Sequence, residues 1–162
     1  MAPWASAQYR KMSAEDGYRA VAFALLMNTF MKYASKEYVY MPPTCSCATT
    51  AAPAAAAGVA FLHGLTPQQI NDMLCTSQVQ MCGVVCDGAK PSCAFRMFVA
   101  LFGALEAMMM AEKGIRATNV EGFVHDDLKV TLENIYRLQH DVLHNKVDAI
   151  LWDIVKEQKT IH

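Results

Sequence analysis

The feature that most constrains the fold is the run of small side chains over residues 44–62, where alanine and glycine dominate. Small side chains let helix backbones approach closely, and the eleven methionines of the chain fill irregular gaps between such helices. Strand-forming residues are comparatively sparse. The sequence therefore predicts an all-α fold: a compact bundle of about six helices, with this alanine-rich helix buried inside it.

Length and charge bound the remaining possibilities. The 162 residues, 54% hydrophobic and 18% charged, suffice for one sizeable core, so we expect a single helical domain over 1–162. A formal charge of -1 offers no basic stripe for nucleic acid. The apolar stretches 20–31 and 48–65 are too short for a bilayer or are interrupted by Pro53 and His63, so no membrane span is expected. Without a signal-peptide cleavage site, we expect a soluble, intracellular protein, cytoplasmic by default.

Helix signals recur along the chain. Ser13 before an acidic turn is typical of an N-cap, and Thr66 with Gln69 forms a capping box that has Pro67 at the first helical position. Pro53 is expected to kink or divide the alanine-rich segment. With the apolar spacing, these signals predict helices over residues 13–35, 44–62, 67–79, 93–112, 128–142 and 145–155.

The helix expected over 93–112 is the most apolar and is predicted to be the central one. We expect it to be buried on most sides, because large apolar side chains surround it. These side chains are Phe95, Phe98, Val99, Phe102 and Leu105.

The cysteines gather in one part of the chain, residues 45–93. A chain of this length can form a stable core without disulfide bonds, so the clustering of the cysteines favours metal or redox chemistry. The spacings C-x-C, C-x3-C and C-x6-C match neither paired C-x2-C zinc ribbons nor the bacterial ferredoxin run. Cys75, in a helical pattern, is expected to be a buried core side chain, whereas Cys86, in a loop, is expected to be functional. The six are Cys45, Cys47, Cys75, Cys82, Cys86 and Cys93.

The loop over 81–92 is where chemistry is expected, because it places a thiol, a carboxylate, an ammonium and a hydroxyl before a buried helix. Gly83 and Gly88 permit close backbone approach, and the free N–H groups at the start of the next helix favour a negative ligand. The same residues also fit an ordinary turn, in which Asp87 and Lys90 form a solvated ion pair.

Cys86-Asp-Gly-Ala-Lys-Pro-Ser-Cys93, preceded by Cys45-Ser-Cys47-Ala and an alanine-rich helix, closely resembles the C-terminal half of the L-cysteine desulfidase family. That family is related to the alpha chain of iron–sulfur L-serine dehydratases. The segments Thr66–Ile70 and Glu121–Asp126 are similar to further elements of the family, in the same order.

The resemblance covers residues 18–155 and leaves 1–17 as an N-terminal lead-in and 156–162 as a tail. The N-terminal half of the family, which supplies a third cluster cysteine and much of the substrate site, has no counterpart in this sequence. Ser46 and Cys82 also stand where the family usually has glycine and threonine. We therefore expect a second protein chain, in a homo- or hetero-oligomer, to supply the rest.

The resemblance implies a lyase that depends on a [4Fe-4S] cluster. Its substrate would be a small amino acid: sulfide is eliminated from L-cysteine, or water from L-serine, to give pyruvate and ammonia. Cys86 and one of Cys45 or Cys47 match cluster ligands of the family. Cys93 matches the second cysteine of the motif, as a further ligand or as a nearby thiol.

The same motif supplies candidate catalytic residues. By position only, Asp87, Lys90 and Ser92 are candidates for orienting the substrate or the ligands. None of the five histidines is nominated as the general base, which we expect to lie outside this chain.

Two other interpretations stay open. One is a structural zinc site on Cys45, Cys47, Cys82 and Cys86, with no iron–sulfur cluster. The other is a non-catalytic, degenerate family member without a cofactor, which serves as a structural subunit of a larger assembly. Bound iron and sulfide would separate these interpretations from the lyase.

Overall fold

Six α-helices make up most of the described chain, and their order agrees with the predicted all-α bundle. The computed structural model describes residues 1–34, 44–85, 93–119, 122–143, 153 and 156. No strand occurs among these residues; one isolated antiparallel bridge joins two loops. The elements are α1 (Ala2–Tyr9), α2 (Ala14–Tyr33), the π-helix η2 (Cys47–Ala51), α3 (Ala52–Leu62), α4 (Pro67–Met81), α5 (Cys93–Glu112), α6 (Leu128–Leu138) and the π-helix η3 (Gln139–Leu143).

The predicted caps begin the helices as expected. Ser13 Oγ accepts the Asp16 N–H at 3.1 Å at the start of α2. At the start of α4, Thr66 Oγ1 accepts the Gln69 N–H at 3.2 Å, and the Gln69 side chain accepts the Thr66 N–H at 2.9 Å. Each bond satisfies a backbone donor that has no partner within the helix. The capping box read from the sequence is confirmed.

The first residues form a helix, α1 (Ala2–Tyr9), within the segment 1–17 that was predicted only as a lead-in. Trp4 of α1 packs against Gly17 of α2. Its ring centroid lies 5.0 Å from that of Tyr18, which is also in α2. At the end of α1, Arg10 Nη1 donates to the Leu62 carbonyl oxygen at the end of α3, at 2.8 Å. These contacts with α2 and α3 hold a helix of only eight residues, which would not be stable alone.

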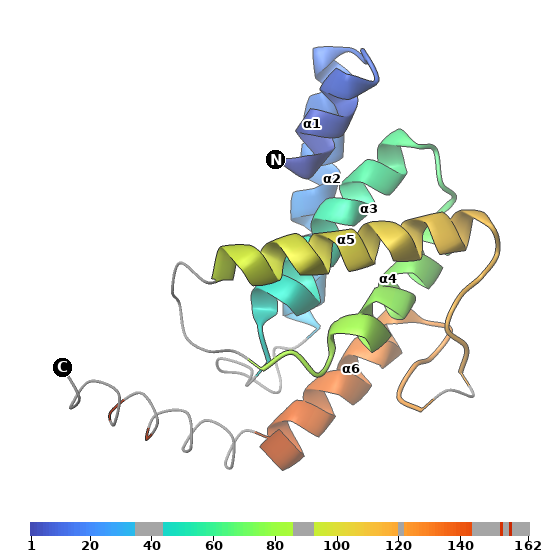
Figure 1. Ribbon diagram of the computed structural model, residues 1–162. Coiled ribbons are helices and arrows are strands. Elements are labelled where there is room, and N and C mark those ends of the chain that lie inside the picture. Colours follow the sequence, from blue (N-terminus) through green and yellow to red (C-terminus); the bar gives the residue numbers. More distant parts are fainter. Residues whose placement is uncertain (35–43, 86–92, 120–121, 144–152, 154–155, 157–162) are drawn as a thin grey trace.

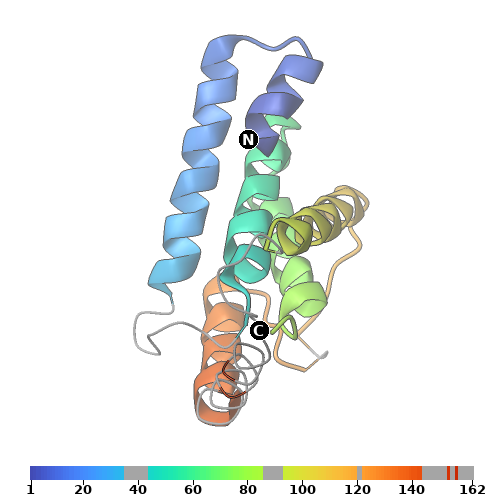
Figure 2. The same ribbon diagram turned by 60° about the vertical axis from the view of Figure 1, so that its left-hand side comes forward.

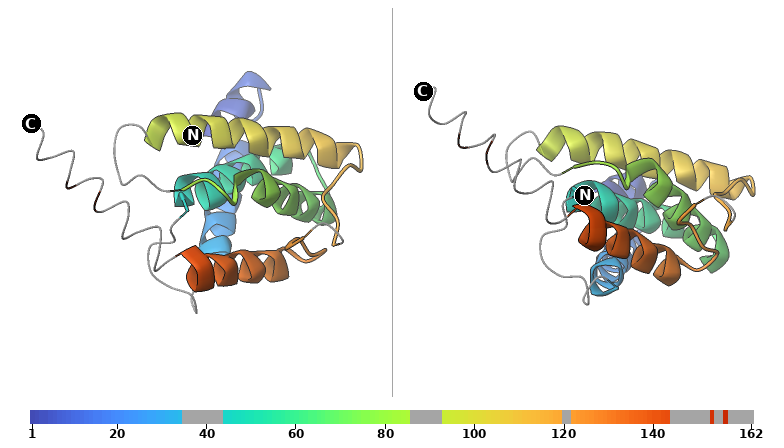
Figure 3. Two further views of the ribbon diagram at one scale, coloured as in Figure 1. Left: turned by 60° about the horizontal axis from the view of Figure 1, so that its bottom comes forward. Right: turned by 90° about the horizontal axis from the view of Figure 1, so that it is seen from below.

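The helices form layers around α3 and α4. Helices α2 and α3 run side by side, with α1 beside their upper ends (Figure 2). Helix α5 crosses α3 and α4 on one face of this layer (Figure 1), and α6 lies on the opposite face (Figure 3). The Tyr136 hydroxyl donates to the Met31 carbonyl oxygen at 3.1 Å and joins α6 to the end of α2. The main core therefore draws on five helices, α2 to α6.

The small residues of α3 let three helices meet closely, as the composition predicts. A Cβ on Gly58 would stand 2.7 Å from the Ala20 carbonyl oxygen and from Pro3 Cγ, and 2.9 Å from Ala24 Cβ. Nine of the eleven residues of α3 are buried. Glycine at 58 is thus required by the space between α1, α2 and α3.

The expectation that α5 is buried on most sides is wrong. Its buried residues, on the side of α3 and α4, are Met108 and four alanines, Ala100, Ala104, Ala107 and Ala111. Four large side chains of the predicted ring are exposed, Phe95 by 77%, whereas the fifth, Leu105, is half-buried against the main core. Helix axes approach most closely where side chains are smallest, so the alanine face packs inward and the phenylalanine face is left outside.

A polar cluster fixes the connection between α5 and α6. Arg116 Nη1 lies 2.7 Å from Asp126 Oδ1, and its Nε lies 3.8 Å from Asp72 Oδ2 in α4. Asn71, beside Asp72, donates to the Asp126 carbonyl oxygen at 2.8 Å and accepts the Leu128 N–H at 3.0 Å. The start of α6 is therefore held against α4 through one asparagine.

Candidate functional site

Two segments that carry cysteines meet at an isolated backbone bridge. Thr44 pairs in antiparallel fashion with Val85, and the Cys45 N–H donates to the Val84 carbonyl oxygen at 2.7 Å. Val85 directly precedes Cys86 in the sequence, and adjacent Cα atoms are about 3.8 Å apart. The C-x-C motif thus lies beside the residue that leads into the second cysteine motif.

The C-x-C motif stands on a fixed turn at the start of the π-helix η2. The Cys45 carbonyl oxygen accepts hydrogen bonds from the backbone N–H groups of Ala48 and Thr49, at 2.9 and 3.0 Å. The Thr49 hydroxyl donates to the same oxygen at 3.2 Å. Thr50 Oγ1 donates in the same way to the Ser46 carbonyl oxygen at 2.7 Å. Side-chain hydroxyls therefore tie the backbone of the motif to the helix that follows it.

A glutamine that belongs to none of the predicted motifs completes this turn. Pro53 has no N–H, so the carbonyl four residues earlier, that of Thr49, lacks its usual helical donor. Gln78, 1% exposed on α4, donates Nε2 to that carbonyl oxygen at 2.8 Å. The proline and the buried glutamine thus act together, since Gln78 uses an acceptor that Pro53 leaves free. Wide π-turns of this kind occur often at functional sites.

The two thiols of the motif differ in burial. Cys45 is 2% exposed and belongs to a small apolar cluster with Ala48, Met81 and Ala100, which joins η2, α4 and α5. Cys47 packs against the same cluster and is half-buried. The Cys45 thiol is therefore shielded from water, whereas the Cys47 thiol is the more accessible of the two.

An open groove of about 570 Å³ lies beside this cluster. Arg96 Nη1 donates to the Val85 carbonyl oxygen and so places a cationic side chain from α5 next to the bridge. The surroundings of the groove are otherwise apolar, which favours a small ligand held by few polar contacts. The lining includes Ala48, Met81, Val84, Val85, Phe95 and Arg96.

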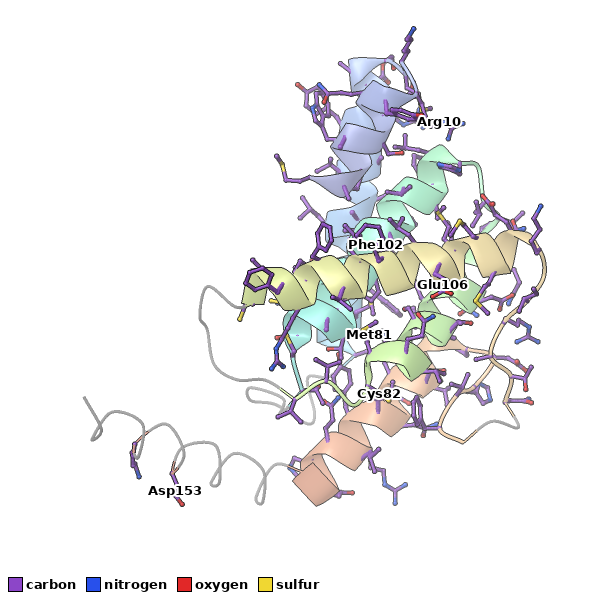
Figure 4. The ribbon with its side chains drawn as sticks, in the orientation of Figure 1. Arg10, Met81, Cys82, Phe102, Glu106 and Asp153 are labelled. Carbon is purple, nitrogen blue, oxygen red and sulfur yellow. The ribbon has the colours of Figure 1, made fainter. Side chains whose placement is uncertain are left out.

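Cys82 and Cys93 stand at the two helix ends that flank the second cysteine motif. Cys82 follows the last residue of α4, its Sγ lies 3.7 Å from the Val79 carbonyl oxygen, and partial burial raises the pKa of its thiol above the ordinary value. Figure 4 shows Met81 directed toward α5 and Cys82 on the side of α4 away from α5. Cys93 is the first residue of α5 and is half-buried.

The remaining predicted site residues, Cys86, Asp87, Lys90 and Ser92, lie outside the described residues. Among the residues that the structure describes, no three histidine, cysteine, aspartate or glutamate side chains gather closely enough to hold a metal ion. Every predicted ligand set includes Cys86, so the cluster and zinc assignments stay predictions.

The described part of the site nevertheless fits a thiolate-bound cluster in its donor chemistry. Cys45 and Cys47 place two thiols on one fixed turn against an apolar cluster. Beside them the Thr44 hydroxyl is buried and has no hydrogen-bond partner among the described residues, which leaves a polar atom for a sulfur or another acceptor.

Cys75 lies elsewhere, inside the main core, as its helical pattern predicts. It is 2% exposed, and its Sγ lies 3.6 Å from Thr131 Oγ1 of α6. Burial raises the pKa of this thiol to about 11. A thiol that stays protonated and shielded is unsuited to ligate a metal or to act as a nucleophile.

The described histidines make local contacts away from the groove. His125 Nδ1 accepts the Asp127 N–H at 3.0 Å before α6, and His140 Nδ1 lies 2.9 Å from Asp141 Oδ1. His63 Nδ1 lies 3.6 Å from Glu112 Oε1. These contacts give the three side chains structural partners at helix ends and turns.

Comparison with known proteins finds one matching family model and a set of bacterial relatives. The family model described as serine dehydratase alpha chain matches residues 1–151. The UPF0597 protein of Shewanella halifaxensis is 34% identical over 140 residues, which are 86% of this chain and 31% of that protein. The UPF0597 protein of Clostridium botulinum is 32% identical over 148 residues, 91% of this chain and 33% of that protein.

A more distant relative matches a similar share of this chain and of its own length. The UPF0597 protein of Desulfatibacillum aliphaticivorans is 26% identical over 151 residues, 93% of this chain and 34% of that protein. The chain thus spans about a third of the length of the curated relatives it matches. No solved structure matches it.

Proposed function

The chain belongs to the serine dehydratase alpha chain family, and on that premise we propose that it is the cluster-binding part of a [4Fe-4S]-dependent lyase. The family match confirms the resemblance read from the cysteine motifs. The lyase would eliminate sulfide from L-cysteine or water from L-serine and would need a second chain. The observation that carries the proposal is the Thr44–Val85 bridge, which joins the C-x-C turn to the segment leading into Cys86.

The ligands proposed are Cys86 and one of Cys45 and Cys47, with Cys93 as a further ligand or a neighbouring thiol. The hydroxyls of Thr49 and Thr50 bind the backbone carbonyls of Cys45 and Ser46, so the backbone of the C-x-C turn is held in place before any ligand arrives. When bound, such a cluster supplies an iron that acts as a Lewis acid on the leaving group.

The elimination removes the α-proton and the β-substituent of the substrate, and the electron pair of the Cα–H bond becomes the new double bond. The enamine so formed takes up a proton and then water to give pyruvate and ammonia. Asp87, Lys90 and Ser92 are proposed to orient the substrate. The base that accepts the α-proton is assigned to the second chain, since the described histidines have local structural contacts.

The test is anaerobic purification of the full chain with its native partners, followed by iron, sulfide and zinc analysis. We expect about four irons and four sulfides per complex, and turnover of L-cysteine or L-serine. Cys86→Ser should abolish iron binding, and one of Cys45→Ser and Cys47→Ser should do the same. Cys75→Ser is the matched control and should retain iron, because Cys75 lies in the other core.

Other outcomes would overturn the proposal. Zinc in place of iron, lost in Cys82→Ser and in Cys86→Ser, would establish the structural zinc site. A complex that holds neither metal and turns over neither amino acid would establish the non-catalytic subunit. That second function is favoured by the names of the relatives, which state no activity.

A further inference from the structure

The C-x-C motif is joined to α3 by a π-turn, which is one residue wider than an α-turn. The Ala52 N–H donates to the carbonyl oxygen of Cys47, five residues earlier, whereas an α-helix would use the carbonyl four residues earlier. One extra residue rotates the motif about the helix axis by about 100° relative to a continuous α-helix. The π-turn therefore sets the direction in which the thiols of Cys45 and Cys47 leave the backbone.

Pro53 keeps this turn wide. In an α-turn its ring would clash with the carbonyl oxygen of Thr49, four residues earlier, and it has no N–H to donate to that oxygen. Pro53 is fully buried among the small residues of α3, so its ring has no space into which it could withdraw. The Thr49 carbonyl therefore turns away from the helix axis.

Gln78 of α4 binds the carbonyl that Pro53 displaces. Its Nε2 donates to the Thr49 carbonyl oxygen at 2.8 Å, and its side chain is 1% exposed. An apolar side chain of similar size would fill this space without needing a partner, whereas a buried amide requires one. The bond therefore favours the wide turn over an α-turn, in which the same carbonyl would point along the helix axis.

The motif is bonded to the turn, so a change in the turn reaches the thiols. Thr49 Oγ1 donates to the Cys45 carbonyl oxygen at 3.2 Å, and Thr50 Oγ1 donates to the Ser46 carbonyl oxygen at 2.7 Å. Rotation of the motif by about 100° would also break the 2.7 Å bond from the Cys45 N–H to the Val84 carbonyl oxygen. The width of the turn thus decides whether the two cysteine-bearing segments meet.

We propose that Gln78 and Pro53 are positioning residues of the candidate site, which together hold the π-turn that orients the thiols of Cys45 and Cys47 toward their ligand. Gln78 acts through the Thr49 carbonyl, and Pro53 acts through the shape of the turn. This inference rests on the proposed function in one respect, that one of the two thiols is a cluster ligand. It implies that the stability of the fold and the binding of iron can be separated by substitutions at these two positions.

The test compares Gln78→Leu with the double variant Pro53→Ala/Gln78→Leu, each in the full chain with its copurified partners. Alanine at 53 restores an N–H for the Thr49 carbonyl and removes the clash, so the turn can close into an α-turn. We expect the double variant to unfold at a higher urea concentration than Gln78→Leu. It should nevertheless hold iron roughly tenfold more weakly than the parent, or not at all, in competition with a chelator. The matched control, Pro67→Ala/Gln80→Leu at exposed positions of α4, should hold iron as the parent does.

A second measurement reports the direction of the thiols without any metal. After iron is removed from the full chain, a thiol reagent under native conditions should modify Cys47 before Cys45, which is 2% exposed. Mass spectrometry of the labelled peptides gives the two rates. The double variant should lose this preference for Cys47, because the motif has rotated, and the control variant should keep it.

Three results would overturn the inference: a double variant that holds iron as tightly as the parent, one that keeps the labelling preference of the parent, or one no more stable than Gln78→Leu. The first would show that Gln78 serves the stability of the fold alone. A parent complex that holds no iron would refute the proposed function and not this inference. The labelling of Cys45 and Cys47 would then decide whether Gln78 and Pro53 orient the thiols.

Discussion

Gly58 lies against the backbone of Ala20 so closely that a Cβ on the glycine would stand 2.7 Å from the Ala20 carbonyl oxygen. A carbonyl oxygen in a helix cannot move aside as a flexible side chain can. The contact therefore sets the distance between α2 and α3.

We expect Gly58→Ala to lower the free energy of unfolding by about 1–3 kcal/mol, because the overpacking outweighs the better helix propensity of alanine. Urea denaturation followed by circular dichroism measures this change. Gly83→Ala is the control, since a Cβ there meets nothing within 4 Å. Equal stability of the Gly58 variant and the parent would mean that the helices can separate at no cost.

Gln78 is predicted to stabilise the fold through the Thr49 carbonyl. Gln78→Leu keeps the approximate volume but leaves a buried acceptor without its donor, so we expect a loss of about 1–3 kcal/mol in the free energy of unfolding. Gln80→Leu, at an exposed position of the same helix, should change it little. A thiol reagent under native conditions should also modify Cys45 faster in Gln78→Leu. Unchanged stability and labelling would show that the turn holds without this bond.

Stability should depend on pH through Cys75. Its pKa rises from the ordinary 9.0 to about 11 on folding, so the folded state keeps the proton that the unfolded chain loses. The contribution is complete below pH 9 and is lost as the pH rises from 9 to 11; the difference of two pKa units corresponds to at most about 2–3 kcal/mol. Urea unfolding across this interval should show a steeper decline for the parent than for Cys75→Ala. Parallel pH profiles of the parent and Cys75→Ala would contradict the conclusion that folding raises the pKa of Cys75.

Asn71 should matter more to the start of α6 than the ion pair near it. Asn71→Ala leaves the Asp126 carbonyl and the Leu128 N–H without their partner, and we expect a loss of about 1–3 kcal/mol in the free energy of unfolding. Arg116→Ala should cost less, because its guanidinium is open to water, which screens its attraction to Asp126. Hydrogen exchange at the Leu128 amide reports the same difference locally. A larger loss in the free energy of unfolding for Arg116→Ala than for Asn71→Ala would contradict this prediction.

Local signals made several elements predictable. The caps at Ser13 and Thr66 depend on residues three positions away, so the start of α2 and of α4 could be read from the sequence. The run of small residues likewise predicted the close packing at Gly58. Such features need no knowledge of the tertiary arrangement.

Features that depend on distant residues could not be predicted in the same way. Alanines and phenylalanines both look apolar in α5, and only the closeness of α3 and α4 decides which face is inside. The bond from Gln78 to Thr49 crosses between two helices, and Pro53 predicted only that the alanine-rich segment would be kinked or divided. The pairing of Thr44 with Val85 joins segments far apart in the chain, although the cysteine motifs beside them pointed to a shared site.

Helix α4 sets the spacing between the two regions that it anchors. Asn71 holds the start of α6 and Gln78 holds the C-x-C turn, seven residues or about 10 Å further along the same helix. Seven residues are nearly two whole turns, so the two side chains leave the helix on similar sides. Inserting or deleting one residue between them would rotate one anchor by about 100° relative to the other. This short stretch of α4 therefore tolerates exchange of residues far better than any change in its length.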